Sequence, residues 1–356
     1  MPFISPVTQV RALTFIRRQR LLTIPGETVA IAGQDVSPIQ VVARAGMPAG
    51  VFVLHASKVL GVAPEELEQH LLVSIGANVQ QGTPLMRRPS RFGRTKLFRS
   101  PAGGVLREVR HGYLVLQQGG TLKEVRAMME GRVAAVIPSR GVILETNGTL
   151  VQALWDSGKE GFGTLKMAAN APDYVLEADR IGAGASNAIV VTGVVEQPEV
   201  LLRLEEVGAR GLIAGGLSAG LCKRSREVSF PVAVTDGVGG SSMAGPIFEL
   251  LEQSEGRQAS ILAGSQRAGG QRSEIIIPLQ VSDTAGREWS KGDSPEVGSL
   301  VRILRIGGPV SLGHVASLHD ESSAVSGNKL APGATVRLED GKEIYVPYTN
   351  LDLIVQ

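Results

Sequence analysis

Apolar and polar residues alternate over much of the first third of the chain, and short turns interrupt the alternation. Alternation over four to eight residues is the pattern of a strand with one buried face. The sequence therefore predicts short strands at residues 28–32, 40–45, 50–55, 71–75 and 83–86. One short helix is predicted at 63–68, where Pro64 stands in the first turn and acidic residues follow near the positive end of the helix.

The periodicity changes after Ser186. Residues 188–192 form an apolar run of buried-strand type, and apolar residues in 198–207 recur at helical spacing before a helix-ending Gly208. Further strands are predicted at 211–214, 231–235 and 259–262, with a helix at 243–251. This β-α-β-β-α-β order predicts a small sheet that is covered by helices and contains parallel pairs.

After about residue 298 the short alternating strands return, and a second β layer is predicted for 124–185. The predicted fold class is therefore mixed β and α/β. The predicted organisation is an N-terminal arm at 1–24, a barrel-type β module at 25–123, a second β layer at 124–185, an α/β module at 186–280 and a small barrel at 297–356.

Composition agrees with this organisation. A chain of 356 residues exceeds the size of one growing core, and 44 glycines beside 19 prolines are typical of frequent turns. The net charge of +2 gives no global field that would indicate a partner. The single Cys222 excludes an internal disulfide, which favours a reducing, cytoplasmic location. The sequence has neither a signal-peptide pattern nor 18 consecutive apolar residues, so no membrane span is predicted.

Glycines six residues apart flank Val79 in residues 76–82, and the run Ser-Pro-Ala-Gly-Gly-Val opens a return strand at Ser100. This pattern resembles the barrel-sandwich hybrid fold of biotinyl and lipoyl carrier domains, of ion-pumping quinone reductase and Rnf-type subunits, and of RNA polymerase inserts. The resemblance covers residues 26 to 117 and implies a fold rather than an activity. We expect no covalently carried group, because Lys166 lies far beyond this motif.

In the C-terminal portion, Val-Arg-Ile at 301–303, Gly-His-Val at 313–315 and a later Val-Arg-Leu-Glu-Asp-Gly-Lys at 336–342 resemble a KOW-type or SH3-like barrel. Barrels of that kind bind RNA or protein, which makes nucleic acid a possible partner; here, however, acidic residues outnumber Arg302, Arg305 and Arg337. The order of modules as a whole resembles a bacterial family, and that resemblance concerns architecture alone.

The strongest concentration of charge lies between the strands that end at Leu85 and begin again at Ser100. Six cations and two interleaved phenylalanines occupy residues 87–99, a combination that can contact an acidic protein surface or nucleic acid. A solvated hairpin tip is the simpler interpretation. The candidate contact residues are Arg87, Arg88, Arg91, Phe92, Arg94, Lys96 and Arg99.

Two glycine-rich loops follow predicted strands of the α/β module. Free backbone N–H groups in such loops can hold a phosphate, although neither loop matches an established phosphate-binding motif and turn formation alone also explains them. The candidate phosphate-loop residues are Gly215, Gly216 and Ser218 in the first loop and Gly239, Gly240 and Ser241 in the second.

Catalytic and metal chemistry finds little support. The five histidines are scattered without paired ligand spacing, and Cys222 has no histidine nearby in sequence, although Lys223 and Arg224 could lower its pKa. We therefore assign no catalytic residue, no metal and no cofactor. The first hypothesis is a non-enzymatic scaffold or accessory protein that presents β-barrel surfaces to a protein partner. The alternatives are a nucleotide- or flavin-phosphate-binding redox-accessory protein and an RNA-associated KOW-type factor.

Overall fold

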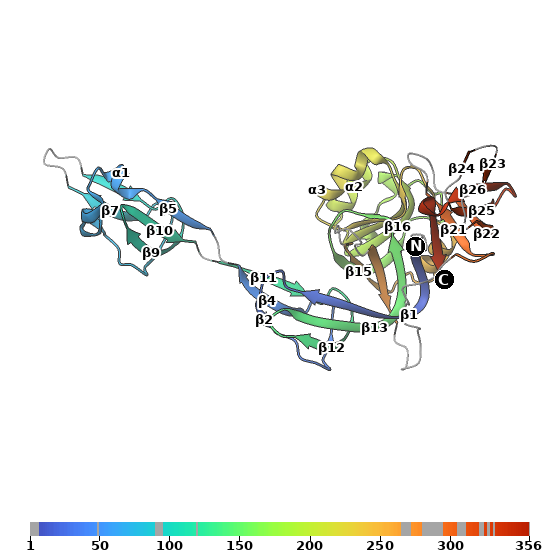
Figure 1. The fold of residues 1–356 in the computed structure, drawn as a ribbon, viewed down its shortest axis with the longest axis horizontal. Helices are drawn as coiled ribbons and strands as arrows, with labels where there is room; N and C mark the ends of the chain where they lie inside the picture. The colour runs from blue at the N-terminus through green and yellow to red at the C-terminus, as the bar shows by residue number, and fades with distance from the viewer. Residues whose placement is uncertain are drawn as a thin grey trace.

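The computed structural model describes residues 7–47, 50–89, 95–118, 120–264, 272–279, 295–304, 311–319, 324–325, 328–329 and 332–355. The structure is 50% strand and 16% helix, which confirms the predicted β-rich mixed class. The molecule is elongated: a small module, residues 50–118, lies at one end of a β-structured stem, and a larger body lies at the other (Figure 1). We call these parts the distal module, the stem and the body.

The distal module contains a four-stranded antiparallel sheet in the order β5-β10-β9-β6 and a separate hairpin of β7 and β8. Leu60, Leu85, Leu106 and Leu114 are fully buried in its own core. The predicted helix at 63–68 is a 3-10 helix. The elements are β5 (Val51–Leu54), α1 (Ala56–Leu60), η1 (Pro64–His70), β6 (Asn78–Val79), β7 (Pro84–Arg88), β8 (Lys96–Arg99), β9 (Gly104–Arg110) and β10 (Tyr113–Gln117).

The stem connects to the distal module through two adjacent strands. Met47, the last residue of β4, pairs directly with Thr121, the first residue of β11. The whole distal module is therefore an insertion into one β-hairpin. Leu22, Val42, Met129 and Leu144 are buried in the stem. Its elements are β2 (Glu27–Thr28), β3 (Asp35–Val36), β4 (Val41–Met47), β11 (Thr121–Arg126) and β12 (Gly131–Ile137), together with parts of two longer strands.

Those two strands, β1 (Val7–Leu21) and β13 (Gly141–Ala153), run from the stem into the body and pair antiparallel along most of their length. The expected N-terminal arm is therefore an interior strand of the 16-stranded sheet. Near its start β1 also pairs in parallel with β27 (Leu351–Val355). Residues 25–123, expected to be one module, instead divide between the stem and the distal module, because their strands find partners in four separate sheets.

The α/β part of the body has parallel strands in the order β18-β17-β16-β15, continued antiparallel by β19, β20 and β13. Apolar clusters cover both faces of this sheet. The prediction missed α3, which is short, polar and buries little. The elements are β14 (Trp155–Asp156), β15 (Gly161–Met167), η2 (Ala178–Arg180), η3 (Ala183–Ala185), β16 (Ala188–Val195), α2 (Pro198–Glu206), β17 (Gly211–Leu217), η4 (Ala219–Leu221), α3 (Cys222–Glu227), β18 (Val232–Val238), α4 (Gly245–Glu252), β19 (Gln258–Leu262) and β20 (Ser273–Pro278).

The C-terminal part of the body is an antiparallel sheet in the order β27-β21-β22-β25-β26 around buried Val301, Val315, Val336 and Leu351. It lies against the α/β part (Figure 1). Across the described residues, no helix is long and apolar enough to cross a membrane. The elements are β21 (Leu300–Ile303), β22 (Ser311–His319), β23 (Ala324–Val325), β24 (Asn328–Lys329), β25 (Gly333–Leu338), β26 (Glu343–Pro347) and η5 (Tyr348–Asn350).

Candidate functional site

The basic hairpin of the distal module consists of β7 and β8, which pair antiparallel. Two of its arginines bind the module itself. Arg88 Nη1 donates to the carbonyls of Leu60 and Gly61 at 2.9 and 2.7 Å, where α1 ends, and Arg99 Nη1 donates to Gly82 O at 2.9 Å. Such bonds satisfy carbonyls that a helix end or a turn leaves unpaired. Arg88 and Arg99 therefore have structural roles.

Arg87 and Lys96 differ from those two arginines. Both are exposed on the paired strands, and within the described residues neither side chain makes a hydrogen bond or an ion pair. The backbone carbonyl of Arg87, by contrast, lies 3.0 Å from His70 Nδ1. The three other candidates, Arg91, Phe92 and Arg94, lie outside the described residues. Arg87 and Lys96 are thus the described cations of the hairpin that are available for a partner.

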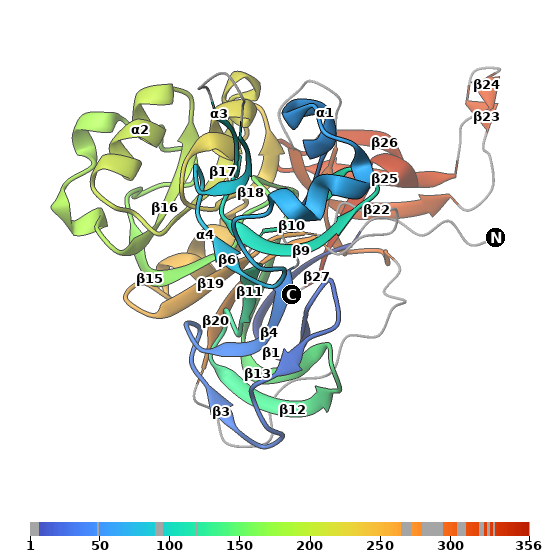
Figure 2. The same ribbon diagram turned by 90° about the vertical axis from the view of Figure 1, so that its left-hand side faces the viewer.

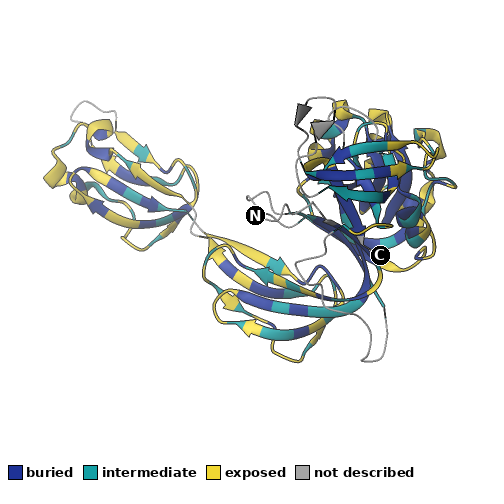
Figure 3. Ribbon diagram, turned by 45° about the vertical axis from the view of Figure 1, so that its right-hand side comes forward, coloured by how far each residue is buried: buried dark blue, intermediate teal, exposed yellow. Residues whose placement is uncertain are grey.

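Strand β5 forms one edge of the distal sheet, and exposed apolar side chains line it. Val51, Phe52 and Val53 are 57, 37 and 63% exposed, which is unusual for a strand with no charged residue. One side of β5 pairs with β10, and the other side is the free edge. Figure 2 presents the distal module toward the viewer, and Figure 3 shows how much of its surface is exposed. The alternation of residues 50–55 predicts this strand, but its place at a sheet edge depends on residues far away in the sequence.

Gly215 and Gly216, expected in a loop, lie instead within the strand β17, and the residues of the second candidate loop pack against them. A Cβ added at Gly215 would lie 2.3 Å from Met243 N, and one added at Gly216 would lie 2.2 Å from Ser241 O, so only glycine permits this approach. Gly239 N donates to Leu217 O and Ser218 N donates to Val195 O. Gly215 and Gly216 thus have a packing function, whereas a Cβ added at Gly239 would meet nothing within 4 Å and one added at Gly240 would meet only Glu196 Oε1 at 3.9 Å.

The N-terminus of α4, beside the second loop, already faces a carboxylate of the chain. Ala244 N donates to Asp236 Oδ2 at 3.0 Å, and Met243 N donates to Pro172 O. Thr235 Oγ1 donates to the same carboxylate oxygen at 2.7 Å. The amides of Met243 and Ala244 at this helix are therefore engaged. Phosphate binding at Gly215, Gly216, Ser218, Gly239, Gly240 and Ser241 stays a prediction that competes with these contacts.

Asp236 belongs to a buried ionic cluster at the junction between the α/β part and the C-terminal sheet. Arg302 is completely buried; its Nε lies 3.4 Å from Asp236 Oδ1, and its Nη1 donates to Thr235 O at 2.6 Å. Asp352, also completely buried, accepts hydrogen bonds from Thr8 and Arg272. Burial raises the pKa of Asp236, while the charge of Arg302 and the hydrogen bonds from Thr235 and Ala244 oppose the rise. The cluster joins five segments of the chain, which contain Thr8, Asp236, Arg272, Arg302 and Asp352.

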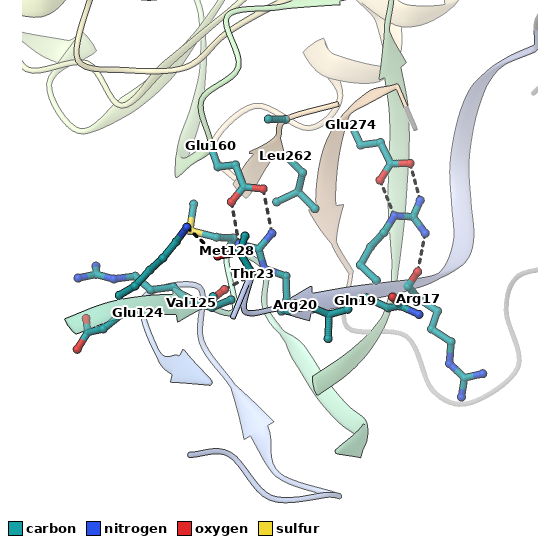
Figure 4. A pocket seen from close by; sticks show the side chains of 15 residues that line it. Arg17, Gln19, Arg20, Thr23, Glu124, Val125, Met128, Glu160, Leu262 and Glu274 are labelled. Atoms are coloured by element: carbon teal, nitrogen blue, oxygen red, sulfur yellow. Dashed lines mark hydrogen bonds and ion pairs between the residues drawn. The ribbon is translucent and has the colours of Figure 1, made fainter. Parts of the chain in front are cut away.

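A cleft of about 900 Å³ lies where the stem meets the body (Figure 4). Arg18 binds Glu274 with both ends of its guanidinium, at 2.5 and 2.6 Å, and Arg20 binds Glu160 at 2.7 and 2.9 Å. These bidentate pairs fix the direction in which β1 leaves the body. Glu160 and Glu274 are thereby held in ion pairs with these arginines. Arg18 and Arg20, in the segment expected to be an N-terminal arm, are thus bound within the chain.

The remaining candidates for chemistry lack partners that would activate them. Burial raises the pKa of the Cys222 thiol, an effect that exceeds the opposing charge of Arg226, so the expectation of a lowered pKa is wrong. Lys166 lies within β15, between β16 and β19, rather than at a hairpin tip. Among the described residues, no group of three His, Cys, Asp or Glu side chains could hold a metal ion.

Comparison with known proteins adds no relative: no family model, no curated protein and no solved structure matches this chain.

Proposed function

We propose that this protein is a non-catalytic adaptor that holds its distal module away from the body for contact with a protein partner. The distribution of exposed apolar side chains carries the proposal. Eight of the 19 large hydrophobic residues that are exposed in the described structure belong to residues 50–118, about a fifth of the chain. Clusters of exposed apolar residues are characteristic of interaction sites.

The finer identities of the modules belong to the same proposal. A barrel-sandwich hybrid for the distal module is supported by the glycine turns at Gly76, Gly82 and Gly112, all at positive φ. An SH3-like barrel is supported by the antiparallel order of β21, β22, β25 and β26. A cytoplasmic location accords with the lone thiol of Cys222.

The two alternative functions have less support. For RNA binding, Arg302 is buried and Arg337 Nη2 binds Glu343 Oε1 at 2.8 Å, so neither offers a free cation. For a nucleotide or flavin phosphate, the amides of Gly239, Met243 and Ala244 already have partners within the chain.

The test is to remove the distal module without disturbing the stem. Since Met47 pairs with Thr121, residues 48–120 can be replaced by Asn-Gly, a dipeptide that closes a two-residue β-hairpin. Full-length protein and this hairpin variant are cross-linked in the native host, and the attached proteins are identified by mass spectrometry. We expect the specific partner to disappear with the module. An unchanged set of partners on the hairpin variant, whose body still melts cooperatively, would contradict the adaptor function.

A further inference from the structure

The strands at the edges of the sheets differ in how they are protected. An exposed edge invites pairing with another chain, and proteins usually block it with charge, proline or short length. β11 carries Lys123, Glu124 and Arg126, and β26 begins with a glutamate and ends with a proline. The edge strands β2, β6 and β14 have two residues each. In β7 and β8 four of the nine residues are basic.

β5 has none of these protections. Its sequence is Val-Phe-Val-Leu, and its neighbours Gly50 and His55 add neither a carboxylate nor a lysine. The free side of its backbone can be identified from the ladder to β10. Gln118 N donates to Gly50 O, and in an antiparallel ladder alternate residues bond to the same neighbour. Phe52 and Leu54 therefore bond to β10, whereas the N–H and C=O groups of Val51 and Val53 point outward, where no described backbone group bonds to them.

Apolar side chains lie beside this edge on both faces of the sheet, where an added strand would cover them. Val51 and Val53 lie on the outer face together with half-buried Val115 and the exposed Tyr113. Phe52 faces the core of the module but remains 37% exposed, because no strand covers it from the edge side. Apolar residues at alternate positions of an incoming strand would cover these side chains.

The charge of the distal module indicates which kind of strand can pair with β5. Residues 50–118 contain nine Lys and Arg and four Asp and Glu, a net charge of +5, whereas the whole chain carries +2. A second copy of the distal module would bring +5 against +5, which opposes edge-to-edge pairing of two copies. An acidic segment is attracted instead, since complementary charge favours encounter and fixes the partner. Arg87 and Lys96, free within the described residues, contribute to that attraction.

We propose that β5 is the docking edge for an extended segment of a partner protein, apolar at alternate positions and acidic beside them, which adds a fifth strand to the distal sheet. This inference rests on the proposed adaptor function. Main-chain bonds to Val51 and Val53 supply affinity in this mode of recognition, and the covered side chains supply specificity.

The experiment uses the full-length protein and a displayed library of random ten-residue peptides, followed by binding measurements with the enriched synthetic peptides. The test variant is Val53→Pro, which removes an outward N–H without removing a bond to β10. The matched control is Val53→Thr, which keeps the N–H and the branched shape. We expect enriched peptides with alternating apolar and acidic residues, a loss of affinity of at least tenfold in Val53→Pro, and little loss in Val53→Thr.

A second measurement does not depend on any variant. Amide hydrogen exchange of the unsubstituted protein should slow at Val51 and Val53 when an enriched peptide is added, because their N–H groups become bonded. Failure to enrich any peptide, equal binding to Val53→Pro, or unchanged exchange at both amides would overturn the proposal. Dimerisation of the free protein that Val53→Pro abolishes would also overturn it, since the occupant would then be a second copy.

These outcomes are distinct from failure of the adaptor function. If native partners require the distal module but bind Val53→Pro normally, the module docks through another surface and only the edge assignment fails. If the hairpin variant retains every partner, the adaptor function itself fails.

Discussion

Arg302 shows how much a single buried side chain can contribute in this protein. It lies between Asp236 and Asp352 and has no exposed surface. Removing one member of a buried ion pair leaves the others as uncompensated charges. These residues are separated by at least 50 positions in the sequence, so no local pattern could have indicated that they meet.

We predict that Arg302→Ala lowers the free energy of unfolding by about 3–5 kcal/mol, the usual cost of breaking a buried pair. Urea denaturation would measure the loss. Arg337→Ala is the matched control, because the Arg337–Glu343 pair on the neighbouring strands is exposed and should contribute at most about 1 kcal/mol. Equal effects of the two substitutions would show that the cluster is not stabilising.

The raised pKa of Asp236 predicts a dependence of stability on pH. Between the pKa of the unfolded state, about 3.9 for an aspartate, and the higher folded value, the folded state binds more protons. The contribution of Asp236 to stability is therefore complete at low pH and is lost as pH rises through the folded pKa. We predict that Asp236→Asn is most destabilising, relative to the unsubstituted protein, in acid and becomes less so as pH rises. Denaturation at several pH values checks this, and the opposite trend would reject it.

At the scale of elements, the basic hairpin separates into two functional pairs. Arg88 and Arg99 bond to carbonyls of the distal module, whereas Arg87 and Lys96 do not bond within the described residues. The hairpin therefore has two cations with structural roles and two that remain for the proposed contact with a partner.

We predict that Arg87→Ser with Lys96→Ser changes the free energy of unfolding by less than about 0.5 kcal/mol per site, as exposed substitutions usually do. The affinity for the partner should fall. The affinity of the variant should also depend less steeply on salt concentration than that of the unsubstituted protein. The control, Arg88→Ser with Arg99→Ser, should lose roughly 1 kcal/mol per removed bonding side chain. Full partner affinity in the first variant would assign the hairpin to solubility alone.

Local patterns predicted where the strands and helices lie better than which strands pair with one another. Gly104 lies in the strand β9, where a Cβ would lie 2.4 Å from Gln117 O, and Gly112 lies in a turn with a φ of 82°. The helix before Gly208 was also predicted, because its apolar spacing is a property of one segment. The pairing of β1 with β27, the exposure of β5 and the carbonyl bonds of Arg88 depend on residues far away in the sequence, which alternation does not encode.

At the scale of the whole molecule, the distal module and the body have separate apolar cores. The distal module joins the stem, and through it the body, at one pair of neighbouring strand ends, Met47 and Thr121. Few contacts cross such a boundary, so the two parts should unfold independently.

We predict that the full chain shows at least two calorimetric transitions and that replacing residues 48–120 with Asn-Gly removes one of them. The midpoint of the remaining transition should stay within a few degrees, since a change of 1 kcal/mol shifts a domain of this size by about 2–4 °C. A single transition in both proteins, or a collapse of the body in the variant, would contradict independence.

The parallel pairing of Val7 with Leu353 also has a consequence for the order of folding during synthesis. The distal module finds every strand partner within residues 50–118 and can fold while the ribosome is still at work on the body. The start of β1 must instead wait for a strand that is translated far later, and until then it is an unpaired strand in a crowded cell. The other end of β1, with Arg17, Arg18 and Arg20, pairs instead with β13, which is translated much earlier.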